Sequence, residues 1–330
     1  MVMWVVLGLS LTVLAQDGSA QGPDAVLDWH VVADLPLPGK AARFDYQSFD
    51  LSPTRRLWIA HMGAGEVLAF DVTERAVVAR VRDMPGVTGV RAGPALERIF
   101  AALSARHEVA VLDSRTGQVL ARVPGGRFPD GLTYAPQAKK LYVSDEYGRQ
   151  ELVIDVPSLT ARRSVAAGGE VGNTQYDSVS GRIWIAVQTS NELAAIDPLT
   201  DSNVKRVALP GIEHPHGFHL DSAHRLAYVT GERNSKLGVL DLHTRRVTHT
   251  YDVESEPDVL ALDSVRGRLY VAAESGVISA FQIRADSLVP LKQYEAPHAH
   301  SVAVDPGTGL VYVPLENVRG RPVLRILELE

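Results

Sequence analysis

Short runs of apolar residues recur along the chain at a nearly constant interval, and each run contains one aromatic residue. Successive aromatic residues are separated by 42, 42, 42, 44, 42 and 42 positions; they are Trp58, Phe100, Tyr142, Trp184, Tyr228, Tyr270 and Tyr312. Between them, apolar and polar residues alternate in short stretches bounded by Asp, Gly, Pro and Ser, a pattern typical of β-strands joined by tight turns. The interval therefore predicts an array of β repeats.

Each repeat contains four expected strands. The first leads into a hairpin turn such as DSVSG at 177–181, and the second carries the aromatic residue. The fourth follows a short polar turn, and the third ends in an aspartate in five of the repeats: Asp71, Asp113, Asp155, Asp197 and Asp241. No long segment has a helical period. Four strands in each of seven repeats predict an all-β fold, a seven-bladed β-propeller with four-stranded blades.

The two ends of the sequence are expected to build one blade together. The seventh repeat stops at Glu330 after its third strand. The segment 28–39, DWHVVADLPLPG, resembles the fourth strand VKRVALPG at 204–211. We expect it to complete the last blade, because pairing there closes the ring and covers an exposed sheet edge. Residues 28–330 then form a single propeller domain.

The regularly spaced residues are expected to be structural. The aromatic residues should fill the space between blades, since such side chains are mostly buried. The aspartates at strand ends and hairpins should hydrogen-bond their own turns. Histidines on outer strands and turns should face solvent; these are His30, His107, His224, His243 and His249.

Residues 1–15 carry no charge, and the apolar stretch at 5–14 is shorter than the roughly 20 residues that a membrane-spanning helix needs. We interpret residues 1–20 as a secretory signal peptide, followed by a short linker at 21–27, which predicts a periplasmic or secreted protein. An N-terminal membrane anchor stays open as an alternative, because no Lys or Arg precedes the apolar stretch.

Composition narrows the function classes. The chain of 330 residues has no cysteine, which excludes disulfides, thiolate catalysis and cysteine-ligated zinc. The net charge of −6 argues against a nucleic-acid partner. The glycine-rich phosphate loop of nucleotide-binding proteins is also missing. We expect a monomer without a stable membrane span after cleavage of the signal peptide.

Aligning the repeats at their hairpins makes the positions around the channel comparable. The ring of first-strand residues reads Asp45, Thr88, Asp130, Gly172, His216, Asp258 and His300. Two residues earlier lies a rim of Arg43, Gly86, Phe128, Glu170, His214, Glu256 and His298. The second strands end on the same face at His61, Asp145, Glu146, Gln188, Glu232, Glu274 and Glu316.

The fifth to seventh repeats contain most of the histidine and acidic residues that could take part in binding or catalysis. Two His-x-His pairs stand 84 residues apart with Glu256 and Asp258 between them, and residues at i and i+2 of a strand share a face. His216, His300 and Asp258 are the candidate ligands of one divalent metal. His214, His298 and Glu256 are the candidate acid–base groups. Further candidates for ligand binding are Asp45, Asp130, Arg43, His61, Glu232, Glu274 and Glu316.

Two other interpretations of this cluster stay open. The polar residues can simply hydrogen-bond one another and hold ordered water. They can also form a polar site for an uncharged or cationic ligand. Ser301 follows His300 in a first strand, where packing is a better explanation than nucleophilic attack.

The anchor motifs AYVTG at 227–231, LYVSD at 141–145 and LYVAA at 269–273 carry a family resemblance. The chain resembles the bacterial YVTN-type propeller proteins, the YncE-like group, over about residues 28–330. It has a looser likeness to the SMP-30/gluconolactonase-type propellers, whose metal-binding Glu and Asn pattern has no match here. The resemblance implies a propeller fold and leaves the role open.

Three functions follow from these observations. The first is an exported propeller that binds a small ligand, a metal or a periplasmic protein at its channel mouth. The second is a metal-assisted hydrolase, lactonase or lyase, in which the metal would activate a water molecule. The third is a protein-interaction scaffold.

Overall fold

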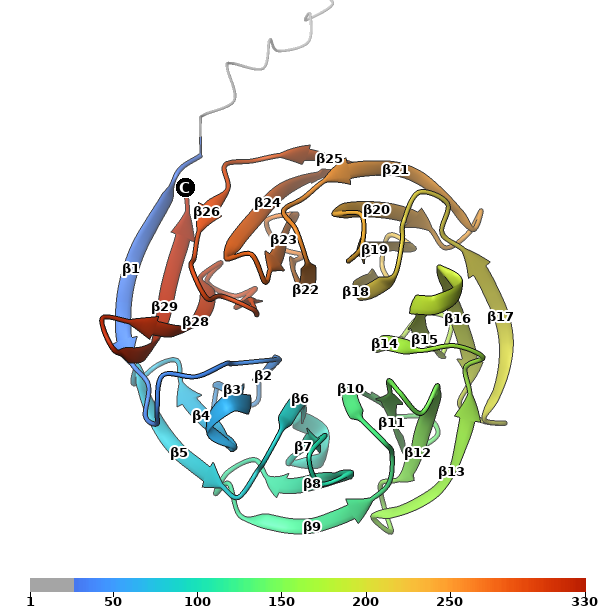
Figure 1. Ribbon diagram of the computed structural model, residues 1–330, viewed down its shortest axis with the longest axis horizontal. Coiled ribbons are helices and arrows are strands. Elements are labelled where there is room, and N and C mark those ends of the chain that lie inside the picture. The colour runs from blue at the N-terminus through green and yellow to red at the C-terminus, as the bar shows by residue number, and fades with distance from the viewer. Residues whose placement is uncertain (1–26) are drawn as a thin grey trace, which may run out of the picture.

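The computed structural model describes residues 27–330, which form seven antiparallel sheets arranged in a ring around a central channel (Figure 1). The predicted signal peptide and nearly all of the predicted linker lie outside these residues. The first strand of each blade is innermost. None of the helices within 27–330 combines the length and apolar character needed to cross a bilayer.

The first three blades follow one another along the chain. Blade 1 contains β2 (Gln47–Asp50), β3 (Arg56–His61), β4 (Glu66–Asp71) and β5 (Ala76–Arg82). Blade 2 contains β6 (Val87–Gly93), β7 (Arg98–Leu103), β8 (Glu108–Asp113) and β9 (Val119–Pro124). Blade 3 contains β10 (Pro129–Ala135), β11 (Lys140–Asp145), β12 (Gln150–Asp155) and β13 (Thr160–Ala166).

The next three blades repeat this order, and short 3-10 turns occur at Met62–Ala64, Pro94–Leu96 and Gln188–Ser190. Blade 4 contains β14 (Val171–Asp177), β15 (Arg182–Val187), β16 (Glu192–Asp197) and β17 (Ser202–Ala208). Blade 5 contains β18 (Pro215–Asp221), β19 (Leu226–Gly231), β20 (Lys236–Asp241) and β21 (Arg246–Asp252). Blade 6 contains β22 (Pro257–Asp263), β23 (Arg268–Ala273) and β24 (Val277–Arg284), whose outer edge pairs with both β25 (Ser287–Pro290) and β26 (Tyr294–Glu295).

The seventh blade joins the two ends of the described chain, as the sequence predicts. Its strands are β27 (Ala303–Val304), β28 (Val311–Val318), β29 (Arg321–Leu329) and the N-terminal β1 (Trp29–Pro36). β1 runs antiparallel to β29, and the backbones of Asp28 and Glu330 exchange hydrogen bonds of 2.7 and 3.0 Å. Arg325 on β29 also forms an ion pair with Asp34 on β1 at 2.6 Å.

The seven periodic aromatic residues are core residues, each no more than 3% exposed. They stand on the second strands and pack between neighbouring blades. The strand-end aspartates also act as predicted: Asp71 accepts backbone hydrogen bonds from Thr73 and Glu74, both at 2.9 Å. Asp305 accepts one from Gly307 at 2.9 Å. The residues that recur in every repeat therefore have structural roles, and candidate functional residues must be sought where the repeats differ.

Candidate functional site

A β-bulge near the start of the first strand places the ring residues at the channel mouth. In β6, β10, β14, β18 and β22 the register with the second strand shifts across the same two positions. Those positions hold Asp130 and Gly131 in blade 3, His216 and Gly217 in blade 5, and Asp258 and Val259 in blade 6. Because a bulge re-aims the side chains it contains, the first residue of each pair is turned into the channel.

Glycine after the ring residue lets neighbouring first strands approach closely. A Cβ atom on Gly217 would lie 1.5 Å from the carbonyl oxygen of Asp258 in the next blade. A Cβ atom on Gly89 would lie 2.0 Å from the carbonyl oxygen of Asp130. Neither space can hold a side chain, so these glycines are required for the backbone approach that positions Asp130 and Asp258.

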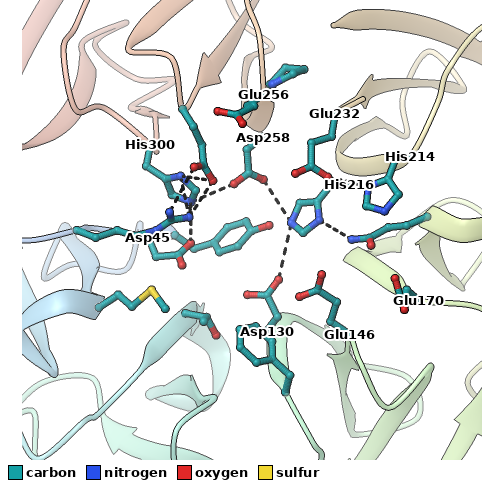
Figure 2. A pocket seen from close by; sticks show the side chains of 18 of the residues that line it. Asp45, Asp130, Glu146, Glu170, His214, His216, Glu232, Glu256, Asp258 and His300 are labelled. Carbon is teal, nitrogen blue, oxygen red and sulfur yellow. Dashed lines mark hydrogen bonds and ion pairs between the residues drawn. The ribbon is translucent and has the colours of Figure 1, made fainter. Parts of the chain in front are cut away.

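The channel mouth contains a cavity of about 440 Å³ (Figure 2). Its basic side chains are two arginines and three histidines: Arg43, Arg233, His214, His216 and His300. Its carboxylates are eight: Asp45, Asp130, Glu146, Glu170, Glu232, Glu256, Asp258 and Glu274. Acidic groups therefore outnumber basic ones even if every histidine carries a charge.

One side of the cavity is an ion-pair network of two basic residues and three carboxylates, here called the Arg43 cluster: Arg43, Asp45, Asp258, Glu274 and His300. Nε2 of His300 lies 3.0 Å from Asp258 and 3.2 Å from Asp45, and its Nδ1 lies 3.2 Å from Glu274. Arg43 contacts Glu274 at 2.9 Å. Burial disfavours the charged imidazole of His300. The negative charges of Asp258 and Asp45 outweigh this effect of burial and raise the pKa of His300 well above its ordinary value.

Asp258 is the central carboxylate of the site. His216 from blade 5 approaches its other oxygen, Oδ1, at 3.5 Å. Burial would raise the pKa of Asp258, yet the charges of His216 and His300 prevail and lower it to about 2. The pKa of Glu274 is also lowered to about 2, first by the hydrogen bond from His300 and then by Arg43, against the opposing effect of burial. Both carboxylates are held ionised.

The opposite side, here called the acidic sector, consists of Asp130, Glu146 and Glu170 on blades 3 and 4. Its cationic neighbour His216 remains 3.9 Å from Asp130 (Figure 2). Burial and the charge of Asp45 raise the pKa of Asp130 to about 8. Burial also raises the pKa of Glu146. Asp130 is therefore largely protonated near pH 7, and its negative charge develops as the pH rises through about 8. Glu170 forms an ion pair with Arg149 at 3.2 Å, whereas Glu146 forms none in the part of the chain that the structure describes.

His216 joins the two sides. Burial opposes its protonation, but Asp258, Asp130 and Glu146 raise its pKa to about 9. Its Nδ1 lies 2.6 Å from the side-chain amide of Gln188. A pair of aromatic rings, Phe128 and Tyr147, adjoins the acidic sector with ring centroids 4.8 Å apart.

The predicted convergence of all four histidines is wrong. His214 and His298 have left-handed backbone angles, with φ of 55° and 63°, and β18 starts only at Pro215 and β27 at Ala303. Strand alternation therefore does not apply to either pair, although His214, His216 and His300 all line the cavity. His214 turns to Glu232 at 2.7 Å on the cavity rim, whereas His298 is exposed and does not line the cavity.

Two other candidates lie away from the cavity. His61 is fully buried; its ring stacks on Phe44 at 4.1 Å, with Nδ1 3.4 Å from Glu66. Glu316 is half-buried on β28. Neither is among the cavity-lining residues. The candidates that do line it are Arg43, Asp45, Asp130, His214, His216, Glu232, Glu256, Asp258, Glu274 and His300.

The predicted metal ligands are only partly brought together. Within residues 27–330, a group with metal-ligand potential comprises Asp258, Glu274 and His300, with donor atoms within 4.8 Å of one another, and omits His216. Nη2 of Arg43 lies 3.2 Å from both ring nitrogens of His300. A coordinating imidazole must be neutral. With His300 protonated, Arg43 and His300 pair with these carboxylates, so a metal here would have to displace the His300 proton and the Arg43 contact.

Sequence reasoning missed Tyr46. Its side chain is 9% exposed, it lines the cavity, and its hydroxyl has no hydrogen-bond partner within the described chain. The equivalent positions of the other blades were informative, because most hold small residues: Gly89, Gly131, Asn173, Gly217, Val259 and Ser301. One bulky polar residue in a ring of mostly small ones marks it as a component of the site.

Comparison with known proteins agrees with the fold and with the YncE-like resemblance. No family model matches the chain. The uncharacterized protein YncE of Salmonella typhimurium is 24% identical over 170 residues, which cover 50% of this chain and 47% of that protein. The aligned region thus spans about half the length of this relative. The chain is a seven-bladed β-propeller distantly related to YncE.

Solved structures support the architecture alone. Virginiamycin B lyase from Staphylococcus aureus matches with a TM-score of 0.73 and 11% identity, covering 91% of this chain and 99% of that one. A chain of the mitotic checkpoint complex matches with a TM-score of 0.76 and 13% identity, covering 97% and 99%. A lyase and a checkpoint assembly share this scaffold, so the fold does not determine the function.

Proposed function

We propose that this YncE-like propeller binds a small organic cation at its channel mouth, in the acidic sector. The observation that carries the proposal is the imbalance of charge in a partly enclosed cavity, where eight carboxylates face two arginines and three histidines. In the Arg43 cluster, each carboxylate has a contact of 3.2 Å or less with Arg43 or His300. In the acidic sector, Asp130 lies 3.9 Å from its cationic partner His216, and Glu146 has no ion pair among the described residues. This is the part of the cavity that a positively charged ligand would neutralise as Asp130 loses its proton.

Two further features favour an organic cation over a bare metal ion. The ring pair Phe128–Tyr147 offers aromatic faces beside the carboxylates, and such faces attract alkylammonium groups. The unpartnered hydroxyl of Tyr46 can hydrogen-bond a polar substituent of the ligand. A metal ion at Asp258, Glu274 and His300 would instead have to displace Arg43, which already contacts Glu274.

Tetramethylammonium is the sharpest probe, because its charge does not change with pH. We expect saturable binding in calorimetric titration, with an affinity that rises between pH 6 and pH 9. Asp130, whose pKa is raised to about 8, loses its proton in this range, and His216, whose pKa is raised to about 9, begins to lose its charge. Both changes make the cavity more negative.

Variants locate the binding. Glu146→Gln and Asp130→Asn should each weaken tetramethylammonium binding at pH 8 by about threefold or more, the order expected for one charge contact at a partly solvated site. Glu74→Gln removes an exposed carboxylate on an outer turn and should leave the affinity unchanged. Titrations with magnesium and with zinc test whether the cavity binds a metal ion instead of an organic cation. Absence of saturable tetramethylammonium binding, or equal affinity in all three variants, would disprove the proposal.

A second candidate function is acid–base catalysis. Asp130 and His216 titrate near neutral pH, at about 8 and 9, and lie 3.9 Å apart. Groups tuned in this way are typical of proton-transfer sites. A panel of lactones and esters at pH 7–9 tests it: turnover that disappears in both Asp130→Asn and His216→Asn would favour an enzyme. Cation binding without turnover of any substrate would favour the binding protein.

Export remains part of the proposal and rests on residues 1–20 alone. The expected outcome is recovery from the periplasm or medium of a bacterial host, with a mature N-terminus near residue 21. Recovery in the membrane fraction with residues 1–20 intact would instead support the anchor alternative.

A further inference from the structure

A second cavity of about 490 Å³ lies further along the first strands, on the hairpin side of Tyr46. Tyr46 lines both cavities and therefore stands between them. Among the side chains that line this second cavity, the basic ones are Arg91 and His219, and there is no carboxylate. The sign of the charge is thus opposite to that at the channel mouth.

The two basic residues occupy one ring of equivalent positions. Each member pairs in register with the anchor aromatic of its own blade; the ring reads Ser48, Arg91, Thr133, Gln175, His219, Ala261 and Ala303. The neutral polar members tie neighbouring blades together. Ser48 accepts a hydrogen bond from the backbone of Ala92 at 3.0 Å, and Thr133 accepts one from Tyr176 at 2.9 Å.

Arg91 makes no such tie. Within residues 27–330 its side chain has neither an ion pair nor a hydrogen bond, although it reaches solvent in the cavity. Its side chain is exposed within the cavity, and none of the residues that line this cavity is acidic. An arginine that stabilised the fold would be expected to reach a carboxylate or a carbonyl group. This one keeps its donors free within the cavity.

The pKa of His219, on blade 5, reflects the unpaired charge of Arg91. Burial and the charge of Arg91 lower its pKa to about 4, against the opposing effects of Asp221 on its own strand and of the Leu260 backbone on β22. The imidazole is therefore neutral near pH 7 and carries a single N–H, which would turn from the Leu260 backbone to a bound ligand.

We propose that this second cavity is a binding site for a small oxoanion, a molecule bearing a carboxylate or a phosphate group. Arg91 would hold the anion through the paired donors of its guanidinium, a geometry that matches both groups. His219 would add a hydrogen bond from the facing side of the ring. The proposal does not depend on the channel-mouth function, since it involves a different cavity and ligands of opposite charge.

The experiment follows the His219 ring and the Arg91 side chain by NMR during titration with inorganic phosphate and with acetate, at constant ionic strength. His219→Gln assigns the ring signal. We expect saturable shifts of both groups and a rise in the pKa of His219 from about 4 by about one unit or more, as an opposite charge at close range produces. Tighter binding of phosphate would indicate a phosphate ester as ligand, and tighter binding of acetate a carboxylate.

Arg91→Gln should weaken binding of either anion by about tenfold or more, since it removes the paired charged donors. It should also raise the pKa of His219 in the free protein, because the repulsion is gone. Arg284→Gln removes an exposed charge at the end of β24 and should leave both properties unchanged. Non-saturable shifts, or equal anion affinity in Arg91→Gln and the unaltered protein, would overturn the proposal. Melting curves verify that the variants are folded.

Discussion

Single carboxylates at the channel mouth differ sharply in their proton affinity, although they occupy equivalent positions in different blades. Asp258 lies between two imidazoles and is held ionised, with a pKa of about 2. Asp130 occupies the same bulge position in blade 3, but its closest charged partner, His216, is 3.9 Å away. Burial and Asp45 raise its pKa to about 8. Equivalent backbone positions therefore give opposite charge behaviour, because the partners differ.

Asp130→Asn should change how stability depends on pH. Since the pKa of Asp130 is raised in the folded state, the folded protein holds a proton that the unfolded chain releases between about pH 4 and pH 8, and stability falls over that range. The variant removes this loss. Relative to the unaltered protein, it should gain at least about 1 kcal/mol between pH 5 and pH 9. Urea unfolding at pH 5, 7 and 9 measures this, and parallel stability curves would contradict it.

The identity of the site residues was accessible from the sequence, whereas their orientation was not. Aligning the repeats identified His216, Asp258 and His300 as residues of one ring, because position within a repeat determines position around the channel. The left-handed backbone angles at His214 and His298 break strand alternation, and no pattern of residue types in the sequence predicts these angles. The stacking of His61 on Phe44 depends on contacts between segments that alternation cannot describe.

At the scale of the strand, the bulge and its glycine are what bring ring residues of adjacent blades together. Gly217→Ala would place a methyl group 1.5 Å from the carbonyl oxygen of Asp258, so β18 and β22 would have to separate. We expect a loss of about 2 kcal/mol or more in the free energy of unfolding, as for overpacked core sites.

The control for this change is Gly307→Ala in an exposed hairpin turn, where the nearest contact is a side chain at 3.2 Å. Its free energy of unfolding should stay within about 0.5 kcal/mol of the unaltered value. Urea unfolding of both variants decides the matter. Equal stability of the two variants would show that the close approach of the strands is not needed.

Closure of the ring by β1 was predicted at element level from the missing fourth strand of the last repeat and from the likeness of two short segments. The structure confirms it with a register running from Trp29–Leu329 to Pro36–Val323. The split outer edge of blade 6, where β24 pairs with both β25 and β26, was not predicted, because a short interruption leaves the alternation on either side intact.

Deleting residues 28–39 should lower the free energy of unfolding by about 3–6 kcal/mol, since it exposes the edge of β29 and the side chains packed beneath β1, among them the buried Leu37. A circular permutant is the matched control. A short linker joins Glu330 to Asp28, and the new ends open the turn between β16 and β17, where Leu199 is 68% exposed. The permutant should melt close to the unaltered protein, whereas unchanged melting of the deletion would refute the role of β1.

At the scale of the whole molecule, the net charge is only −6, but the two ends of the channel differ in the sign of their charged residues. Eight carboxylates line the cavity at the mouth, and the second cavity contains Arg91 and His219 without a carboxylate. Tyr46 lines both. An organic cation at the mouth and an oxoanion beyond Tyr46 would each be attracted by the other through a medium that screens charge poorly.

Binding at the two ends should therefore be mutually favourable. With tetramethylammonium at saturation, the affinity for phosphate should rise by about threefold, a coupling at the lower end of those seen between distinct sites. Because such coupling is reciprocal, phosphate should raise the affinity for tetramethylammonium by the same factor. Titrations in which sodium chloride replaces each second ligand at equal ionic strength separate coupling from salt screening. In Arg91→Gln the effect should vanish. If each ligand instead weakened the other, the two would compete for one site, and the assignment of opposite charges to opposite ends of the channel would be wrong.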